Sequence, residues 1–179
     1  EIRLSLVGSE MCIRDSRGTV QDKSLTKIGS NNLFMAYTHI AHDCMVGSNC
    51  ILANGASLAG HVHVGDHAII GGMAGVHQFC HIGPHCFVAA NSLILKDVPP
   101  YIMASGQPAK PFGLNSEGLK RRGFDADVIL QIKRAYKAIY RQGLTVDEAI
   151  AKINDTAHGL IELDVFTDFI KNSSRGIVR

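Results

Sequence analysis

A six-residue repeat between Ile28 and Pro99 constrains the fold of this chain more than any other feature. The first residue of each repeat, which we call a hexad, is large and apolar in twelve successive hexads: Ile28, Phe34, Ile40, Val46, Leu52, Leu58, Val64, Ile70, Val76, Ile82, Val88 and Ile94. The fifth residue is mostly small: Asn32, Thr38, Cys44, Cys50, Ala56, Val62, Ala68, Ala74, Cys80, Cys86, Ser92 and Val98. This pattern predicts a parallel β-helix, in which each hexad supplies a short strand and a corner and three hexads make one triangular coil.

Residues eighteen positions apart are expected to stack in columns, because neighbouring coils lie at the ordinary strand spacing of about 4.8 Å. One such column contains His42, Gly60 and Gln78. His61 and His77 fall beside it on the same side of the prism. The repeat therefore predicts a polar cluster on one wall of the β-helix without any long loop.

The segments on either side of the repeat differ from it in character. Residues 1–16 do not follow the hexad pattern and lack a convincing signal-peptide core, so we interpret them as a non-native or disordered leader. We assign residues 17–100 to the β-helix domain, whose natural N-terminal coils are expected to be missing, and residues 101–179 to a small α-helical C-terminal domain. Pro99 and Pro100 end the last strand, because proline donates no hydrogen bond to a ladder.

Four helices are predicted in the C-terminal domain from apolar spacing and capping residues. They span residues 116–122, 126–141, 145–157 and 160–171. Asn115 or Ser116 can cap the first helix, and Asp125 can cap the second. Thr145 and Glu148 have the spacing of a capping box at the start of the third.

Composition excludes several classes of function. The formal net charge of +2 is too small to favour nucleic-acid binding, and no apolar run approaches the roughly 20 residues that span a membrane. Four of the five cysteines occupy the fifth hexad position, where a small buried side chain is needed: Cys44, Cys50, Cys80 and Cys86. We interpret them as reduced packing thiols of a cytoplasmic protein, and their spacing does not favour a zinc site.

The histidines are the strongest signal for chemistry, since eight of the nine lie between His39 and His85. His42 is the best candidate for a general base, because the carboxylate of the next residue, Asp43, can fix the imidazole tautomer and stabilise the imidazolium. His39 lies at the corner that leads into the same wall. Two pairs eighteen residues apart are expected to be stacked surface ladders: His63 with His81, and His67 with His85.

Five segments together resemble one enzyme family. They are HIAHDC, AGHVHV, GGMAGVHQF, DVPPY and FGLNSEGLKRRGF. With the hexads and the helical tail, residues 17–179 are similar to an N-terminally truncated UDP-N-acetylglucosamine O-acyltransferase of lipid A biosynthesis. The hexad repeat is shared by many acyltransferases, whereas the last segment together with the helical tail is specific to this family.

The resemblance implies a left-handed β-helix and a homotrimer with its active sites in clefts between subunits. It implies transfer of a (R)-3-hydroxyacyl group from acyl carrier protein to the 3-hydroxyl of UDP-N-acetylglucosamine, the first step of lipid A and hence lipopolysaccharide biosynthesis. The acyl donor is a thioester, so no cofactor and no metal ion are expected. Without its first coils the chain is an incomplete enzyme, and inactivity of this fragment is compatible with the assignment.

The site residues of the family carry over by motif. His42 matches the catalytic base, Asp43 would orient it, and the Gly60 N–H would stabilise the oxyanion. The residues that match the substrate cleft are His39, His61, His77 and Gln78. The residues that match the region near the nucleotide and its phosphates are Asn115, Glu117, Arg121 and Arg122. As alternatives, the basic run 120–122 would be a solvated helix end or a contact for the acidic carrier protein.

Two positions depart from the family pattern. Ser16 stands where the family usually has a histidine, which agrees with a junction just after residue 16. Ala90 occupies the level at which the family reads acyl-chain length and where glycine is common. We expect the methyl group of Ala90 to shorten the accepted chain.

Two other functions stay open at this point. One is a hexapeptide-repeat acyltransferase with a different donor or acceptor, against which the C-terminal segment argues. The other is a zinc-dependent β-helix protein related to carbonic anhydrase, which the abundance of histidines makes worth testing.

Overall fold

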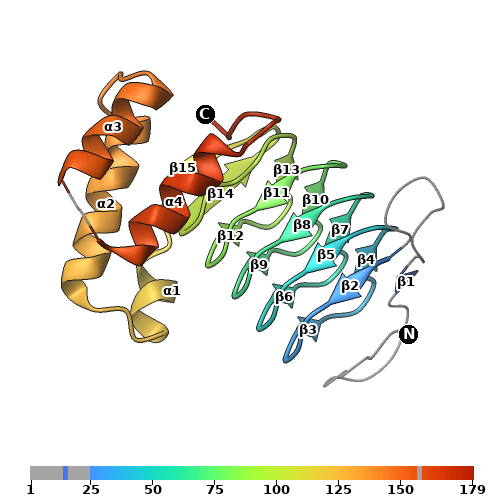
Figure 1. Cartoon of the computed structure of the whole chain (residues 1–179). Coiled ribbons are helices and arrows are strands. Elements are labelled where there is room, and N and C mark those ends of the chain that lie inside the picture. The colour runs from blue at the N-terminus through green and yellow to red at the C-terminus, as the bar shows by residue number, and fades with distance from the viewer. Residues whose placement is uncertain (1–13, 16–24, 157–158) are drawn as a thin grey trace.

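The computed structural model describes residues 14–15, 25–156 and 159–179. Three sheets form the walls of a parallel β-helix, and four helices lie at its C-terminal end (Figure 1). The fold class predicted from the hexads is confirmed. Most of the predicted leader, together with residues 16–24, falls outside the described residues.

Each hexad contributes one two-residue strand, and the strands fall into the three sheets in rotation. Sheet A contains β1 (Arg14–Asp15), β4 (His39–Ile40), β7 (Ser57–Leu58), β10 (Gly75–Val76) and β13 (Leu93–Ile94). Sheet B contains β2 (Lys27–Ile28), β5 (Met45–Val46), β8 (His63–Val64) and β11 (His81–Ile82). Sheet C contains β3 (Leu33–Phe34), β6 (Ile51–Leu52), β9 (Ile69–Ile70), β12 (Phe87–Val88), β14 (Ile102–Gly106) and β15 (Ala109–Leu114).

Hexad strands from neighbouring coils pair in parallel with the predicted register of eighteen residues. Met45 pairs with His63, and His63 pairs with His81. Backbone hydrogen bonds tie each coil to the next, for example from the Gly47 N–H to the Val64 carbonyl at 2.8 Å. The columns deduced from the sequence are therefore present in the structure.

The first strand is an exception to this register. β1 pairs in parallel with β4, with Arg14 opposite His39, a separation of 39 − 14 = 25 residues. Residues 14–15 thus lie outside the repeat, as predicted, but they do join sheet A. A strand at this position satisfies the backbone groups that the edge of β4 would otherwise leave unpaired.

In the first eleven hexads the fourth residue forms the corner and adopts the left-handed backbone region. Ten non-glycine residues do so with φ between 56° and 64°: Asn31, Tyr37, Asp43, Asn49, His61, His67, Met73, Phe79, His85 and Asn91. Asparagine, aspartate and histidine tolerate this region better than most residues. We name the corners by the sheets that they join: the A/B corner holds residues 42–43, 60–61 and 78–79, the B/C corner holds 48–49, 66–67 and 84–85, and the C/A corner holds 54–55, 72–73 and 90–91.

The core is a narrow column of inward-facing side chains from the first and fifth hexad positions. Ile40, Leu58 and Ile70 are fully buried. The four cysteines of the repeat are buried and unbonded to each other, so their predicted role as reduced packing thiols is confirmed: Cys44, Cys50, Cys80 and Cys86.

Sheet B carries a column of glycines at the position just after each strand: Gly29, Gly47, Gly65 and Gly83. A Cβ added at Gly65 would lie 2.6 Å from the Pro84 backbone nitrogen in the next coil. A groove of about 670 Å³ runs along sheet B, and Phe169 is among the residues that line it.

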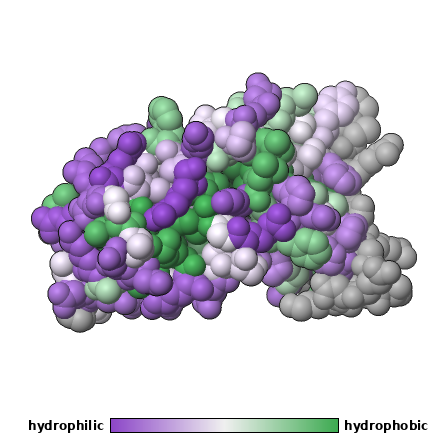
Figure 2. Space-filling view, turned by 90° about the horizontal axis from the view of Figure 1, so that it is seen from above, coloured by the Kyte–Doolittle hydropathy of each residue, from purple (hydrophilic) through white to green (hydrophobic). Residues whose placement is uncertain are grey.

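The polypeptide after the last hexad forms a hairpin and four helices. β14 continues sheet C in parallel with β12, and β15 returns antiparallel to β14. The helices are α1 (Ser116–Arg121), α2 (Ala126–Tyr140), α3 (Val146–Thr156) and α4 (Ile161–Lys171), in agreement with the four predicted helices. Hydrophilic side chains cover much of the helical end, and apolar side chains gather near the middle of the face seen from above (Figure 2).

The predicted caps are confirmed with one exception. The Asn115 side chain accepts the Gly118 N–H at 3.2 Å, and the Thr145 N–H donates to the Glu148 carboxylate at 2.8 Å. Asp125 occupies the N-cap position of α2, but its side chain makes no capping hydrogen bond. Within the described ranges, no helix is both long and apolar enough to cross a membrane.

The glycine column yields a stability prediction. Gly65→Ala brings a methyl group against the Pro84 backbone, which cannot move without disturbing the ladder. We expect the free energy of unfolding to fall by about 2 kcal/mol, as in other overpacked sites. Gly75→Ala is the matched control, because its Cβ would meet Leu93 at an ordinary 3.7 Å. Urea denaturation of both variants checks the prediction, and equal losses would contradict it.

Candidate active site

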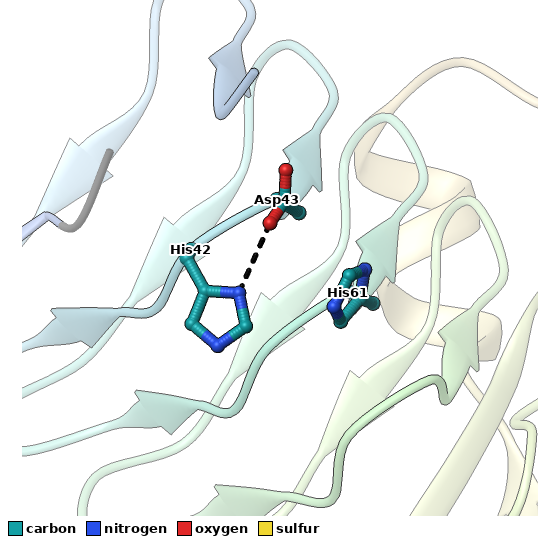
Figure 3. Close-up of side chains that lie close together, drawn as sticks. All are labelled: His42, Asp43 and His61. Atoms are coloured by element: carbon teal, nitrogen blue, oxygen red, sulfur yellow. Dashed lines mark hydrogen bonds and ion pairs between the residues drawn. The ribbon is translucent and has the colours of Figure 1, made fainter. Parts of the chain in front are cut away.

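The A/B corner places an imidazole and a carboxylate side by side. The His42 Nδ1 atom lies 3.0 Å from Asp43 Oδ2 (Figure 3). The Asp43 side chain is only 2% exposed, whereas that of His42 is 40% exposed. The corner backbone forces this arrangement, because the left-handed conformation of Asp43, with φ of 57°, reverses the chain immediately after His42. Asp43 is held from a second side by the Leu25 N–H, which lies 3.3 Å from Oδ1.

This pair has the geometry of an oriented general base. When Nδ1 carries the proton and donates to Asp43, the lone pair of His42 resides on Nε2. The buried carboxylate would also stabilise the imidazolium that forms when Nε2 takes up a proton. The prediction from sequence that Asp43 orients His42 therefore has the required contact.

Gly60 lies directly against the His42 ring, one coil further along. A Cβ at Gly60 would be 2.6 Å from His42 Cε1 and 2.8 Å from Nε2, so the position has no room for a side chain. The Gly60 carbonyl accepts the Phe79 N–H at 3.1 Å. Among the described residues no acceptor takes the Gly60 N–H, which leaves this donor available to a ligand at the corner.

His61 extends the cluster toward the next coil. Its ring meets the His42 ring edge-on, with centroids 5.1 Å apart, and stacks on Phe79 at 4.5 Å. Phe79 was not predicted from the sequence as a site residue, although its position eighteen residues after His61 could have revealed it. The His61 ring lies near the candidate base (Figure 3).

The remaining cleft residues predicted from sequence lie on the same side of the prism. His39 is in β4 of sheet A, and Gln78 occupies the exposed corner position two coils beyond His42. His77 follows β10, and its Nδ1 atom lies 3.1 Å from the Gln78 carbonyl oxygen. The column of His42, Gly60 and Gln78 is thus present as predicted.

The predicted nucleotide-binding residues are at a different corner. Asn115 donates to the His85 carbonyl at 2.9 Å, and Arg122 donates to the His67 carbonyl at 2.9 Å, so both are held at the B/C corner. Glu117 forms an exposed ion pair with Lys120, and Arg121 is exposed on the same helix. Within one chain the structure does not bring these residues to His42.

Ala90 is likewise separate from the catalytic candidates. It is exposed at the C/A corner, where its backbone nitrogen lies close to Gly71. A three-cornered prism keeps its corners apart, so one chain cannot join Ala90, Arg121 and His42 in one cleft. Their binding roles stay predictions.

His85 is the most perturbed titratable group at the B/C corner. Burial, followed by the nearby His67 and Arg122, lowers the pKa of His85 to about 4. Its ring stacks on His67 at 4.8 Å and contacts Phe124 and Tyr101. The ring centroids of His63 and His81 also lie 4.6 Å apart. Both predicted histidine pairs therefore lie ring beside ring in neighbouring coils, as expected from their spacing of eighteen residues.

One group of side chains could hold a metal ion. Ligand atoms of His42, Asp43 and His61 lie within 4.8 Å of one another, the sole such group in the part of the chain that the structure describes. Two imidazoles and a carboxylate suit zinc. The contact between His42 and Asp43 equally suits an oriented base, so the geometry alone leaves the zinc alternative open.

Two family models match the chain. Residues 25–60 and 61–96 match the bacterial transferase hexapeptide model of six repeats. Residues 97–178 match the model for domain 2 of UDP-N-acetylglucosamine O-acyltransferase.

Individual proteins agree with these models. The chain is 61% identical over 163 residues to the acyl-[acyl-carrier-protein]–UDP-N-acetylglucosamine O-acyltransferase of Tolumonas auensis, and the match covers 91% of the chain and 62% of that relative. A solved UDP-N-acetylglucosamine acyltransferase from Francisella novicida is similar with a TM-score of 0.91 and 46% identity, over 94% of this chain and 62% of that one. The solved UDP-N-acetylglucosamine O-acyltransferase of Moraxella catarrhalis has a TM-score of 0.88 and 43% identity, over 99% of this chain and 74% of that one. The chain thus spans about three fifths of the length of the curated relatives that it matches.

The environment of His85 makes stability depend on pH. The pKa of His85 is about 4 in the folded chain and ordinarily 6.5, so the unfolded state binds more protons between these values and stability falls as the pH is lowered through this window. Allowing for partial exposure, we expect His85 to contribute a loss of about 1 kcal/mol from pH 7 to pH 5. Urea denaturation at both pH values should show a smaller loss in His85→Phe than in the wild type. The control is His63→Phe, which replaces an exposed histidine and should keep the wild-type pH dependence. The prediction would be contradicted if His85→Phe lost as much free energy of unfolding between pH 7 and pH 5 as the wild type.

Proposed function

This chain belongs to the UDP-N-acetylglucosamine O-acyltransferase family, and from that membership we propose that it transfers a (R)-3-hydroxyacyl group from acyl carrier protein to the 3-hydroxyl of UDP-N-acetylglucosamine. The observation that carries the proposal is the contact of His42 with buried Asp43, next to the bare backbone of Gly60. An ester formed from a hydroxyl and a thioester needs a base for the hydroxyl and a donor for the oxyanion. This corner offers both.

In the proposed reaction, His42 Nε2 removes the proton from the sugar hydroxyl while the oxygen attacks the thioester carbonyl carbon. The tetrahedral oxyanion accepts the Gly60 N–H. When the C–O double bond reforms, the C–S bond breaks and the carrier thiolate takes the proton from the His42 imidazolium. The products are the ester and the free thiol of the carrier, and the base is regenerated.

Asp43 acts on the tautomer and charge of His42. Its carboxylate accepts the Nδ1–H at 3.0 Å, which keeps Nε2 unprotonated and pointed away from the acid. Burial strengthens this interaction, because little water competes for the carboxylate. His61 and Gln78 lie along the same corner, where they would contact the bound substrates.

We propose that three copies of the chain assemble so that each active site lies between two chains. The proposal is supported by the positions of Arg121 and Arg122. Arg122 is held at the B/C corner with Arg121 next to it, whereas His42 lies at the A/B corner. A cyclic trimer places different corners of neighbouring copies face to face. The guanidinium groups of Arg121 and Arg122 from one chain would then bind the nucleotide phosphates beside the general base His42 of a neighbouring chain.

The cellular setting follows from the proposed chemistry. Transfer to UDP-N-acetylglucosamine would be the first step of lipid A biosynthesis, carried out in the cytoplasm with acyl carrier protein as partner. The zinc-dependent alternative rests on His42, Asp43 and His61, and metal analysis separates the two. Stoichiometric zinc in the purified protein, with loss of activity on chelation, would favour it.

The role of His42 has a direct test. In the full-length protein, His42→Ala removes the only proposed proton acceptor, and we expect kcat to fall by about 10³-fold or more. The side chain is partly exposed, so the thermal midpoint should change little. Acyl transfer from labelled acyl carrier protein measures the rate. Near-normal turnover in a folded variant would reject the base assignment. The control is His63→Ala, the same substitution at a histidine of sheet B away from the A/B corner, which should leave kcat unchanged.

Shared sites predict complementation between variants. If His42 and Arg121 of different chains form one site, His42→Ala and Arg121→Glu are each inactive, but their random mixture restores about a quarter of the sites in a cyclic trimer. Coexpression with two affinity tags isolates the mixed trimers for assay, and in these about one third of the sites should be active. Sites formed within single chains would instead give no recovery.

A further inference from the structure

The C-terminal tail crosses the end of the β-helix at the A/B corner, above the histidine cluster. Its anchor is Asp97, which follows Phe79 by eighteen residues in the corner column and is fully buried. The Asp97 N–H donates to the Gly176 carbonyl at 3.0 Å, and the Val178 N–H donates to the Asp97 carbonyl at 2.9 Å. The tail is therefore paired with the last corner through its backbone.

The Asp97 side chain fixes the tail a second time. Its carboxylate accepts the Ser173 hydroxyl at 2.6 Å and the His81 N–H at 2.8 Å. Arg175 lies between the two anchor points, Ser173 and Gly176. Its backbone is thus held on both sides, although its side chain is exposed.

The Arg175 guanidinium points to the candidate site. Its terminal nitrogen lies 3.4 Å from His77 Nδ1, although 98 residues separate the two. The same Nδ1 atom lies 3.1 Å from the Gln78 carbonyl, so when it carries a proton it donates there and cannot accept from Arg175. No carboxylate in the described part of the chain pairs with Arg175. The guanidinium also contacts the Cys80 thiol, and its remaining donors are available to an anion.

The position along the prism suits a long substrate. Gln78 stacks two coils above His42, a rise of about 10 Å at the ordinary strand spacing. A ligand whose reacting group lies at His42 can reach this level with a phosphate. A fixed guanidinium binds phosphate oxygens in bidentate fashion and is always charged.

We propose that Arg175 is a phosphate-binding residue of the active site, positioned by the tail that Asp97 anchors. The inference rests on the proposed function, in which both substrates carry phosphate: UDP-N-acetylglucosamine has a diphosphate, and the prosthetic arm of acyl carrier protein has a phosphodiester. Either group presents the oxygens that a guanidinium recognises. The residue acts on binding and not on proton transfer, because it contacts no reacting atom.

The test uses Arg175→Gln and Arg175→Lys in the full-length protein, with Lys171→Gln as control. Lys171 is an exposed cation close in the chain, paired with Asp168 at 3.5 Å. We expect Arg175→Gln to raise the KM of one substrate about tenfold, with kcat and thermal midpoint nearly unchanged, since a charge-assisted contact contributes about this much. The KM of Arg175→Lys should lie between those of the wild type and Arg175→Gln, because lysine keeps the positive charge but cannot bind phosphate in bidentate fashion.

The two substrates are varied separately to identify the phosphate. A rise in KM for UDP-N-acetylglucosamine assigns Arg175 to the diphosphate, and a rise for acyl carrier protein assigns it to the prosthetic arm. Unchanged KM values for both, or an equal effect of Lys171→Gln, would overturn the proposal. Should the wild type transfer no acyl group, the proposed function fails, and calorimetric titration with UDP-N-acetylglucosamine and with phosphopantetheine tests Arg175 separately. Equal binding of both ligands by wild type and Arg175→Gln would then overturn it.

Discussion

The hydrogen-bonded contact between one coil and the next is the constraint on which the rest of this structure depends. Each hexad strand is only two residues long, so none is stable by itself, and each gains its backbone partners from residues eighteen positions away. The register admits little slack, since inward and outward side chains alternate along every wall. It explains the glycines of sheet B, where a neighbouring coil approaches within 2.6 Å of a hypothetical Cβ.

The same contact builds the candidate active site. Stacking brings Gly60 against the His42 ring and sets His61 beside it, so that the site needs no loop to assemble. The corner conformation then reverses the chain at Asp43 and delivers its carboxylate to Nδ1. Function and fold thus use one repeated geometry, with ordinary positions of the repeat occupied by residues that can do chemistry.

Periodicity explains how much could be predicted. The strands, the columns, the packing cysteines and the pair of His42 with Asp43 all follow from residue spacing, because local rules and the repeat place them. The contact of Arg175 with His77 did not emerge, since it joins an irregular tail to the prism across 98 residues. The pairing of β1 with β4 breaks the eighteen-residue register and was equally invisible. Asn115 and Arg122 were linked to the site by resemblance, and a repeat within one chain carries no information about how two chains meet.

The uniform register also decides which changes in chain length this fold can absorb. Losing one residue inside a coil would turn every later inward side chain outward, and the whole stack beyond that point would have to form anew. Losing or gaining a complete coil leaves all other columns intact and merely shortens or lengthens the prism. Insertions and deletions in such a protein are therefore tolerated as whole coils of eighteen residues or as loops inserted at corners. Changes of any other length inside a coil would disrupt the register.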